Sequence, residues 1–330
     1  MTANGIAEIR KSPIAALSPA VSVVVSTYNH ASMLASTVRA VMNQDLKGAL
    51  EMIVCDDAST DGTHALMLEL IETARQPLTY IRLARNSGPA IGRNVALEFA
   101  QGRFIAFTDS DCIPAPSWLQ AALDAFVTDD IGIVQGQTVA ELQQVPLFEH
   151  HVATSRLEGT FPTANVVYRA TAIRGHRFNP ECWSRRATWE DADLAWRVQR
   201  AGWRAVYASE ALVAHKVIPL SPLKWVFWAS RYRKWPAISA RYPGFRRHLF
   251  LGVWIRPLHL LFQLALLGLA FAWRQPITLL LVAPYAVAFA RCRGLSGRFP
   301  PAKLAAYLAW DSVACVSLLA GSLRYRSVVL

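Results

Sequence analysis

The amino-acid sequence predicts an α/β fold in which a mostly parallel sheet carries helices on both faces, followed by a helical membrane region. In the front part of the chain, short apolar runs rich in β-branched residues alternate with segments of helical character, which is the pattern of right-handed βαβ units. Runs such as "VSVVVSTY" at 21–28 are apolar over most of their length, as strands covered on both faces are. The back part instead combines basic residues, tryptophans and aliphatic runs, which is typical of helices at a membrane.

The expected elements follow one another in a regular order. Strands are expected at 21–28, 50–57, 78–84, 103–109 and 131–137, with helices at 31–43, at 64–74 and from the "RNSGPAIGRN" stretch to about residue 100. The pattern loosens after residue 137 and becomes helical again at 189–203, and two short strands at 204–208 and 211–216 follow. This order predicts one sheet domain formed by residues 21–218, preceded by a leader at 1–20.

Acidic residues follow two of the expected strands at their carboxyl ends. Asp57 follows one apolar run, and "FTDSD" places Asp109 and Asp111 after another. Carboxylates are rarely kept beside a core unless they are paired or bound to a cation, although Asp and Ser also cap solvated turns. Because ligands of parallel sheets lie beyond the carboxyl ends of the strands, the shared placement favours a cation site over a turn.

Charge is distributed unevenly along the chain. Residues 1–215 contain 18 Lys and Arg against 22 Asp and Glu, whereas residues 216–330 contain 16 Lys and Arg against Asp311 alone. A basic segment can bind nucleic acid or an anionic membrane, and the 11 tryptophans beside aliphatic runs favour the membrane.

Five cysteines without CxxC spacing indicate buried free thiols in a reducing compartment. The first 20 residues lack a secretory apolar region, so the front domain is expected in the cytosol.

The tail is expected to hold the protein at the cytoplasmic membrane. Residues 219–248 mix Trp, Tyr, Lys and Arg, as helices lying in a bilayer interface do. Within 249–330, apolar segments occur near 257–273, 277–290 and 304–321, of which the outer two approach spanning length. The basic loop before the last segment belongs on the cytosolic side by the positive-inside rule. Three passes fit this orientation, and a pair of re-entrant or interfacial helices is the alternative.

Seven stretches together resemble glycosyltransferase family 2, with its Rossmann-like GT-A fold. They are "VVVSTYN", "CDDASTDGT", "NSGPAIGRN", "FTDSD", "TANVVYR", "WEDADL" and "VAHK". Each stretch is short, but their order along residues 21–218 matches the family, while the tail is not covered by the resemblance. The resemblance implies a glycosyltransferase whose donor is a UDP- or GDP-linked sugar. The tail adds the expected membrane attachment, and its at most three spans are too few for the channel of a processive synthase, so a non-processive type is expected. The glycines of "GPAIG" do not form GxGxxG, which argues against a dinucleotide-binding fold of the dehydrogenase type.

The resemblance assigns a donor site to named residues. Asp111 is similar to the family's metal-binding acid, Asp109 is placed near the metal or the ribose, and His215 is a candidate third ligand of Mg²⁺ or Mn²⁺. A divalent cation stabilises the negative charge that develops on the diphosphate leaving group, and these ions prefer carboxylate oxygens. The other donor-site residues are Asp57, Ser26 and Tyr28 at the nucleotide base, and Arg93 and Asn94, at a helix start, near the phosphates.

The resemblance also implies a general base. The acceptor hydroxyl loses a proton as it attacks, so a positioned carboxylate is required. Asp191 in "WEDADL" resembles the family's catalytic base, with Glu190 beside it. Acidic residues in the first turn of a helix also occur for structural reasons. One base without a second, nucleophilic carboxylate implies a single displacement and inversion at the anomeric carbon.

Other functions are alternatives to this interpretation. "RYRKW" at 231–235 nearly matches the (Q/R)xxRW motif of processive polysaccharide synthases and ceramide-type glucosyltransferases, but Lys234 replaces an arginine, and an interfacial helix explains the stretch equally well. A catalytically silent sugar-nucleotide-binding membrane protein is disfavoured by the intact Asp111 and Asp191.

The expected acceptor is a lipid-linked saccharide or a membrane lipid, in cell-envelope, exopolysaccharide or glycolipid synthesis, because the tail holds the site at the bilayer. Nucleic acid is not an expected partner.

Overall fold

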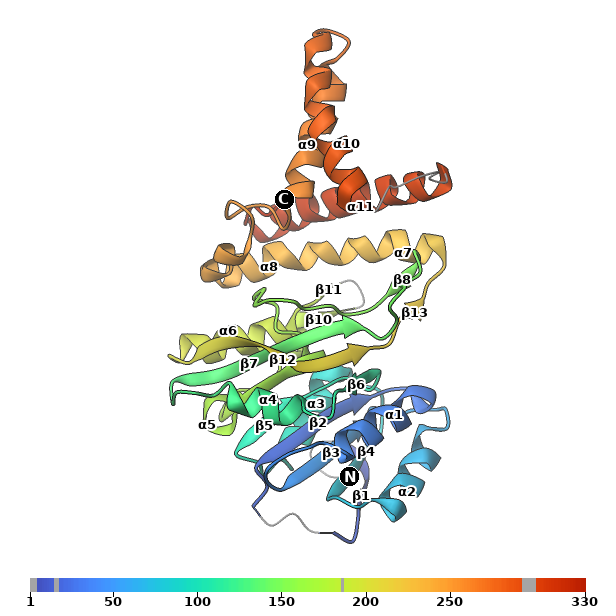
Figure 1. The fold of residues 1–330 in the computed structure, drawn as a ribbon, viewed down its shortest axis with the longest axis vertical. Helices are drawn as coiled ribbons and strands as arrows, with labels where there is room; N and C mark the ends of the chain where they lie inside the picture. Colours follow the sequence, from blue (N-terminus) through green and yellow to red (C-terminus); the bar gives the residue numbers. More distant parts are fainter. Residues whose placement is uncertain (1–4, 15–17, 185–186, 293–300) are drawn as a thin grey trace. The chain divides into compact units, whose positions relative to one another are not determined.

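The computed structural model describes residues 5–14, 18–184, 187–292 and 301–330 (Figure 1). The chain forms two compact units. Residues 1–183 and 189–218 form the first, which we call the sheet unit, and residues 184–188 and 219–330 form the second, which we call the helical unit. The roles of these two parts of the chain stay predictions at this point.

A nine-stranded mixed sheet is the centre of the sheet unit, with the strand order β1-β4-β3-β2-β5-β9-β7-β12-β6. Its strands are β1 (Ile6–Lys11), β2 (Val21–Thr27), β3 (Leu50–Asp56), β4 (Leu78–Leu83), β5 (Phe104–Phe107), β6 (Cys112–Pro114), β7 (Ile131–Ala140), β9 (Val166–Arg169) and β12 (Arg204–His215). The neighbours β4, β3, β2 and β5 are parallel, as are β7 and β12. The strands β1, β9 and β6 pair antiparallel with their neighbours.

Helices cover both faces of this sheet, as the sequence predicts. One face packs against α1 (Ala31–Met42), α2 (Thr63–Thr73) and α4 (Trp118–Asp124). The other packs against α3 (Pro89–Leu97), α5 (Ala170–Ile173) and α6 (Glu190–Arg200). In β2, Val23 and Val25 enter the first core and Val24 the second, and all three are buried. Burial on both faces explains why this strand is a continuous apolar run rather than an alternating one.

The sheet differs from the expectation in three places. Residues 6–11 of the expected leader form β1, an edge strand that pairs with β4 alone and is largely exposed, so its sequence carries polar residues and gives little strand signal. The strands expected at 204–208 and 211–216 are one strand, β12, with an irregularity between Ala208 and Leu212. A bulge accommodates the polar residues that interrupt its apolar pattern. The short strands β6 and β9 had not been expected.

Short elements complete the sheet unit and its borders. They are η1 (Thr163–Asn165), η2 (Pro180–Cys182), the pair β10 (Trp183–Ser184) and β11 (Ala187–Thr188), and the pair β8 (Glu149–His150) and β13 (Ile218–Pro219). All of them except β13 lie in the region between 137 and 188 in which the sequence shows no regular period. The η1 turn matters most for function, because it leads directly into β9 and so lies beside the carboxyl end of β5.

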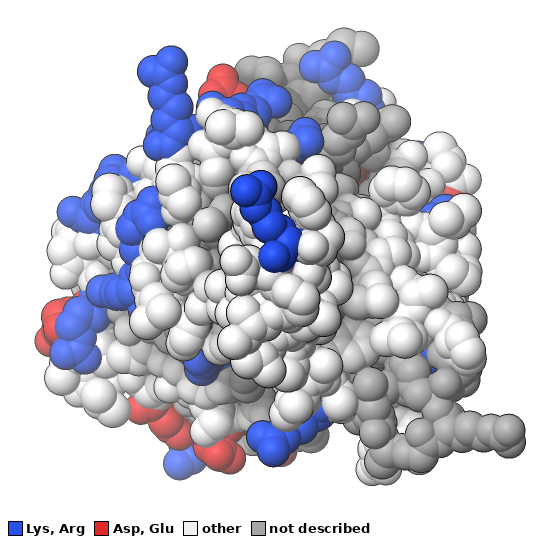
Figure 2. All heavy atoms as spheres, turned by 90° about the horizontal axis from the view of Figure 1, so that it is seen from above, with Lys and Arg blue, Asp and Glu red and all other residues white. Residues whose placement is uncertain are grey.

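The helical unit consists of a rod, a hairpin and a long helix (Figure 1). The rod is α7 (Pro222–Trp228), η3 (Ala229–Arg233) and α8 (Lys234–Arg241), which follow without a break. After η4 (Pro243–His248), the hairpin is formed by α9 (Pro257–Phe271), η5 (Pro276–Leu281) and α10 (Val282–Cys292). The long helix α11 (Pro301–Tyr325) packs along the rod. In the view from the hairpin end, blue basic side chains are more prominent than red acidic ones, and uncharged side chains fill much of the face (Figure 2).

Among the described helices, one stretch, Lys303–Tyr325, is long and apolar enough to cross a membrane by length and composition alone. The segments expected at 257–273 and 277–290 form the shorter helical stretches Pro257–Phe271 and Pro276–Arg291. Most of the basic loop that the positive-inside rule assigns to the cytosol lies outside the described residues. Asp311, whose role the sequence left open, is buried in α11 and accepts a hydrogen bond of 2.8 Å from the hydroxyl of Tyr285 on α10.

Candidate active site

The order of the strands creates the site. From β2 the chain winds through β3 to β4 on one side and then returns to place β5 on the other side of β2. The carboxyl ends of β2 and β5 therefore flank a topological switch point, where α/β sheets bind their ligands. The loop after β5 carries Asp109 and Asp111, and the residues after β2 include Tyr28 and His30. His30 Nδ1 lies 2.7 Å from Ser110 Oγ, so the two loops are in direct contact.

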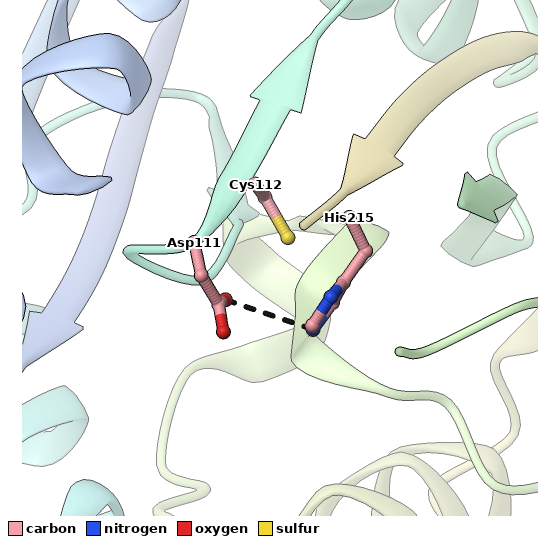
Figure 3. Close-up of side chains that lie close together, drawn as sticks. All are labelled: Asp111, Cys112 and His215. Carbon is pink, nitrogen blue, oxygen red and sulfur yellow. Dashed lines mark ion pairs between the residues drawn. The ribbon is translucent and has the colours of Figure 1, made fainter. Parts of the chain in front are cut away.

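The antiparallel pair β6–β12 brings His215 to the aspartates. Cys112 of β6 is the ladder partner of His215, the last residue of β12, and Asp111 directly precedes β6. His215 Nε2 lies 3.6 Å from Asp111 Oδ1 (Figure 3). This separation is too long for a hydrogen bond. His215 Nδ1 lies 2.7 Å from the carbonyl oxygen of Lys216, which can only accept, so Nδ1 carries a proton and Nε2 is the ring nitrogen that faces Asp111.

This pair fits a divalent cation. A histidine that ligates a metal typically donates its other N–H to a carbonyl or carboxylate, as His215 does to Lys216. Burial raises the pKa of Asp111 and Asp109 adds to the rise, while His215 and His30 oppose it. Bringing two carboxylates together out of water is unfavourable without a positive charge. A carboxylate oxygen with an imidazole nitrogen suits Mn²⁺ or a later first-row ion better than Mg²⁺, which prefers oxygen ligands alone.

The thiol of Cys112 lies beside this pair and had not been singled out from the sequence. Ligand atoms of Asp111, Cys112 and His215 all lie within 4.8 Å of one another (Figure 3). Cys112 is fully buried in the core that packs on α1 and α4, and this burial raises its pKa well above the usual value. Because its side chain packs among the apolar residues of this core, we interpret Cys112 as a core residue.

Arg93 is the centre of an ion cluster beside the aspartate loop. Its guanidinium lies 3.0 Å from Asp109 Oδ1, 3.3 Å from Asp191 Oδ1 and 3.6 Å from Glu190 Oε1. Burial lowers the pKa of Arg93, but Asp191, Asp109 and Glu190 outweigh it and raise the pKa overall. The sequence placed Arg93 near the donor phosphates. The structure joins it to carboxylates from the loop after β5 and from the first turn of α6, and its place near the phosphates stays a prediction.

Thr163 completes this cluster and had not been predicted. Its backbone N–H donates to Asp191 Oδ2 over 3.1 Å, and its hydroxyl oxygen lies 3.2 Å from both Asp109 Oδ1 and Asp191 Oδ2. The hydroxyl carries one hydrogen, so it donates to one of the two carboxylates at a time. Thr163 and Arg93 therefore tie Asp109 to Asp191, which are far apart in the sequence.

Asp57 and Asn94 bind the backbone of neighbouring loops. Both oxygens of Asp57 accept hydrogen bonds of 2.7 Å, one from the N–H of Ser87 and one from that of Gly88. Burial raises the pKa of Asp57, and these two amides partly offset the rise. Asn94 both donates to and accepts from the backbone of Phe178 over 2.8 Å. The amide of Asn94 thus fastens the 178 loop to α3, which begins at Pro89, and its place near the phosphates stays a prediction.

Ser26 and Tyr28 lie beside Asp57, because β2 and β3 pair in parallel register with Thr27 opposite Asp56. Ser26 packs against α3, where a Cβ on Gly92 would lie 2.6 Å from its hydroxyl oxygen. Tyr28 is 42% exposed, so its ring is open to a ligand. The arrangement agrees with a base-binding edge, and the roles of these three residues stay predictions.

Two family models match the chain. Glycosyl transferase family 2 matches residues 22–179, and glycosyl transferase family group 2 matches residues 104–321, which is more than half of the chain. The chain belongs to glycosyltransferase family 2. The predicted family and its GT-A fold are thereby confirmed.

Curated family 2 proteins resemble parts of the chain. A putative teichuronic acid biosynthesis glycosyltransferase of Bacillus subtilis, TuaG, is 44% identical over 93 residues, which cover 28% of this chain and 36% of that protein. The pre-mycofactocin glycosyltransferase of Mycobacterium tuberculosis is 30% identical over 210 residues, covering 59% of this chain and 42% of that protein. The chain thus spans less than half the length of these curated relatives.

Solved structures share the family 2 fold. A mannosyltransferase of Pyrobaculum calidifontis, determined in complex with GDP-Man and Mn²⁺, aligns with a TM-score of 0.58 at 21% identity over 94% of this chain and 88% of that one. TarS 1–349 of S. aureus in complex with UDP aligns with a TM-score of 0.51 at 19% identity over 93% and 92%. At these identities the likeness establishes the GT-A fold.

Proposed function

We propose that this chain is an inverting, metal-dependent glycosyltransferase that moves a sugar from a UDP- or GDP-linked donor to a lipid-linked saccharide or membrane lipid, in cell-envelope polysaccharide or glycolipid synthesis. The observation that carries the proposal is the cluster in which Arg93 and Thr163 join Asp109 to Asp191. A transferase must hold its donor and its general base on either side of one anomeric carbon. This cluster keeps a donor-side acid and a candidate base in fixed positions.

Asp111 and His215, with Asp109 beside them, would hold the cation. A divalent ion bound there neutralises the charge that develops on the diphosphate leaving group. The tautomer of His215 that Lys216 selects, and the two neighbouring carboxylates, support this assignment. The Pyrobaculum relative, which contains GDP-Man and Mn²⁺, supports a nucleotide sugar and a metal of this kind.

Asp191 is proposed to accept the proton of the acceptor hydroxyl. Its side chain is 21% exposed, whereas that of the neighbouring Glu190 is 5% exposed. A base has to reach the substrate, so the more open carboxylate is the better candidate, and Glu190 helps to hold Arg93 in place. Arg93 and Thr163 fix the orientation of Asp191 through one oxygen each. With one accessible base, transfer by single displacement inverts the anomeric carbon.

Replacing Thr163 by Val is expected to lower kcat by about 10- to 100-fold, because a hydrogen bond to a charged group contributes about 1.5–3 kcal/mol and about 1.36 kcal/mol corresponds to tenfold in rate. Valine keeps the shape and the backbone N–H but removes the hydroxyl that contacts both carboxylates. Thr163→Ser retains that hydroxyl and should transfer sugar at nearly the wild-type rate. Initial rates at saturating donor measure both, and equal rates for the two variants would contradict the role of the hydroxyl.

The proposed acceptor follows from the tail and from relatives. A glucosyltransferase of Escherichia coli, WfgD, whose name gives α-D-GlcNAc-diphosphoundecaprenol as its acceptor, is 33% identical over 118 residues, covering 35% of this chain and 44% of that protein. The basic and apolar helical unit supports a position at the membrane, where such acceptors reside. The cytosolic face is proposed because nucleotide sugars are soluble donors.

The proposal is tested by incubating the purified chain with UDP-glucose, UDP-GlcNAc or GDP-mannose, with Mn²⁺ and with a polyprenyl-diphosphate-linked GlcNAc acceptor. Release of nucleoside diphosphate and a glycosylated lipid are the two readouts. We expect one donor to react, and EDTA to abolish the reaction. The double variant Asp111→Ala/Asp191→Asn is the matched blank. Binding of a nucleotide sugar without hydrolysis or transfer under any of these conditions would favour the catalytically silent binding protein.

A further inference from the structure

The long apolar helix α11 is fixed along the rod formed by α7, η3 and α8. Near its start, the rings of Tyr307 and Trp310 lie 5.5 and 4.4 Å from that of Trp225 on α7. Near its end, Gly321 lies so close to the rod that a Cβ would be 2.8 Å from the carbonyl oxygen of Arg233. The contact therefore runs along four turns of α11, about 21 Å at 1.5 Å per residue.

The rod cannot lie in hydrocarbon. Its 20 residues carry five cations, namely Lys224, Arg231, Arg233, Lys234 and Arg241. Each cation costs about 2.5–3.5 kcal/mol at the centre of a bilayer by insertion scales. Because α11 lies lengthwise against the rod, α11 cannot cross the membrane without taking these cations with it. Its length and composition suggest a span, but its packing excludes one.

The hairpin of α9, η5 and α10 has the opposite character. Its outer part exposes large apolar side chains that are 51–81% exposed: Leu267, Leu269, Phe271, Trp273, Ile277 and Leu280. The runs 257–273 and 275–290 contain no Lys, Arg, Asp or Glu and are bounded by Arg256, Arg274 and Arg291. In Figure 1 the two limbs lie side by side and project from α11.

The dimensions of the hairpin match a bilayer. The 15 residues of α9 rise about 22 Å, and the turn to Arg274 extends this further. The six residues of η5 and the eleven of α10 rise about 28 Å together, because a 3₁₀ turn is longer per residue. The hydrocarbon core is about 30 Å thick. The small difference is within the range that side-chain snorkelling and local thinning accommodate.

The hydroxyl of Thr278 and free carbonyl groups at the outer end of the hairpin satisfy one another. The hydroxyl of Thr278 lies 2.8 Å from the carbonyl oxygens of Gly268 and Gln275. A Cβ on Gly268 would lie 2.5 Å from the carbonyl oxygen of Thr278, so only glycine allows the limbs to approach this closely. Close packing at small residues and side-chain satisfaction of free carbonyls are features of membrane helices.

We propose that the α9–η5–α10 hairpin crosses the bilayer, with Trp273, Arg274 and Gln275 at the far interface, and that α11 and the rod lie along the near surface. Arg256 and Arg291 then flank the two limbs on the cytosolic side, as the positive-inside rule requires. Tyr285 fastens the hairpin to α11 through Asp311. The inference rests on the proposed membrane attachment and specifies which segment provides it.

This topology is tested by adding one cysteine at a time to the full chain and labelling it. The signal of the chain without an added cysteine is subtracted as background. A fluorophore is attached at Leu304, Val316 or Leu323 of α11, or at Leu267 of α9, in vesicles of phosphatidylethanolamine and phosphatidylglycerol. Lipids brominated at shallow or deep acyl positions report depth. We expect uniformly shallow positions along α11 and a deep position for Leu267. In a second assay, a membrane-impermeant maleimide should label Gln275→Cys in spheroplasts but not in inverted vesicles.

Each outcome decides the proposal. A depth profile along α11 that is deepest at Val316 would show that α11 spans, and would overturn it. Labelling of Gln275→Cys only in inverted vesicles, or in neither preparation, would make the hairpin re-entrant and overturn the crossing. Recovery of the full chain in the soluble fraction without detergent would instead refute the membrane attachment itself, leaving the transferase site to be judged by the donor assay.

Discussion

Asp191→Asn is expected to lower kcat by about 10²–10⁴-fold, the usual loss for a positioned general base, while the affinity for the nucleotide-sugar donor stays near the wild-type value. Asparagine is nearly isosteric with aspartate, and Asp191 receives hydrogen bonds from Arg93 and from Thr163 without contacting the Asp111–His215 pair in any described bond. The barrier to transfer therefore rises, and the metal and base contacts of the donor persist. Steady-state rates and calorimetric donor binding measure the two effects separately.

Asp193 offers a matched control in the same turn of α6. It is fully buried and lies 2.8 Å from Arg197 within the helix, so Asp193→Asn should lower the stability of the fold while leaving kcat within a few-fold of wild type. If Asp191→Asn transfers sugar at the wild-type rate, the base lies elsewhere, and Glu190 is the next candidate. If Asp191→Asn instead unfolds the sheet unit, the carboxylate is structural.

The acidic residues at the carboxyl ends of the strands could be predicted from the sequence, because the pattern that marks a strand and its end is local. Each apolar run is followed directly by its polar residues, and parallel strands bring Asp57, Asp109 and Asp111 to the same edge of the sheet. The helices on both faces follow from the same runs. The edge strand β1 was missed because it is half polar and pairs on one side only.

The connections within the site could not be predicted, because they depend on contacts between distant segments. Arg93 and Asp191 are 98 residues apart, and Thr163 is 54 residues from Asp109. A helix start beside a glycine-rich loop favours anions in general, so the sequence suggested phosphates near Arg93 but did not reveal the carboxylates that the fold places beside it. Thr163 lies in a region without regular periodicity and offers no local signal except its place in "TANVVYR".

In the tail, too, contacts between distant segments could not be predicted from the sequence. Length and hydropathy rank α11 as the best span, but these quantities do not include the neighbour against which a helix packs. The 3₁₀ segment η5 lengthens one limb of the hairpin without adding residues. A count of apolar residues therefore underestimates how well the hairpin can span a bilayer and overestimates how well α11 can.

Asp111→Ala is expected to abolish Mn²⁺-dependent binding of the donor nucleotide. For the wild-type chain, Mn²⁺ at 100 times its Kd should stabilise the fold by about 2.7 kcal/mol, and this gain should disappear in the variant. The apo variant should fold at least as stably as wild type, since burial raises the pKa of Asp111 and its removal takes an unfavourable buried charge away. His215→Ala should weaken Mn²⁺ binding in the same direction, because it removes the nitrogen that faces Asp111.

Asp129→Ala is the control for this result, because its side chain is fully exposed and it precedes the amino end of β7, whereas His215 lies at the carboxyl end of the parallel strand β12. It should retain both the Mn²⁺-dependent thermal shift and donor binding. The comparison of metals adds a sharper test: with an imidazole nitrogen in the donor set, Mn²⁺ should support binding better than Mg²⁺ in wild type, and His215→Ala should reduce that preference. Undiminished metal-dependent donor affinity in Asp111→Ala would place the cation elsewhere. Loss of the metal dependence with intact folding would show a defect in donor binding. Asp191→Asn, in contrast, should show a defect in kcat alone.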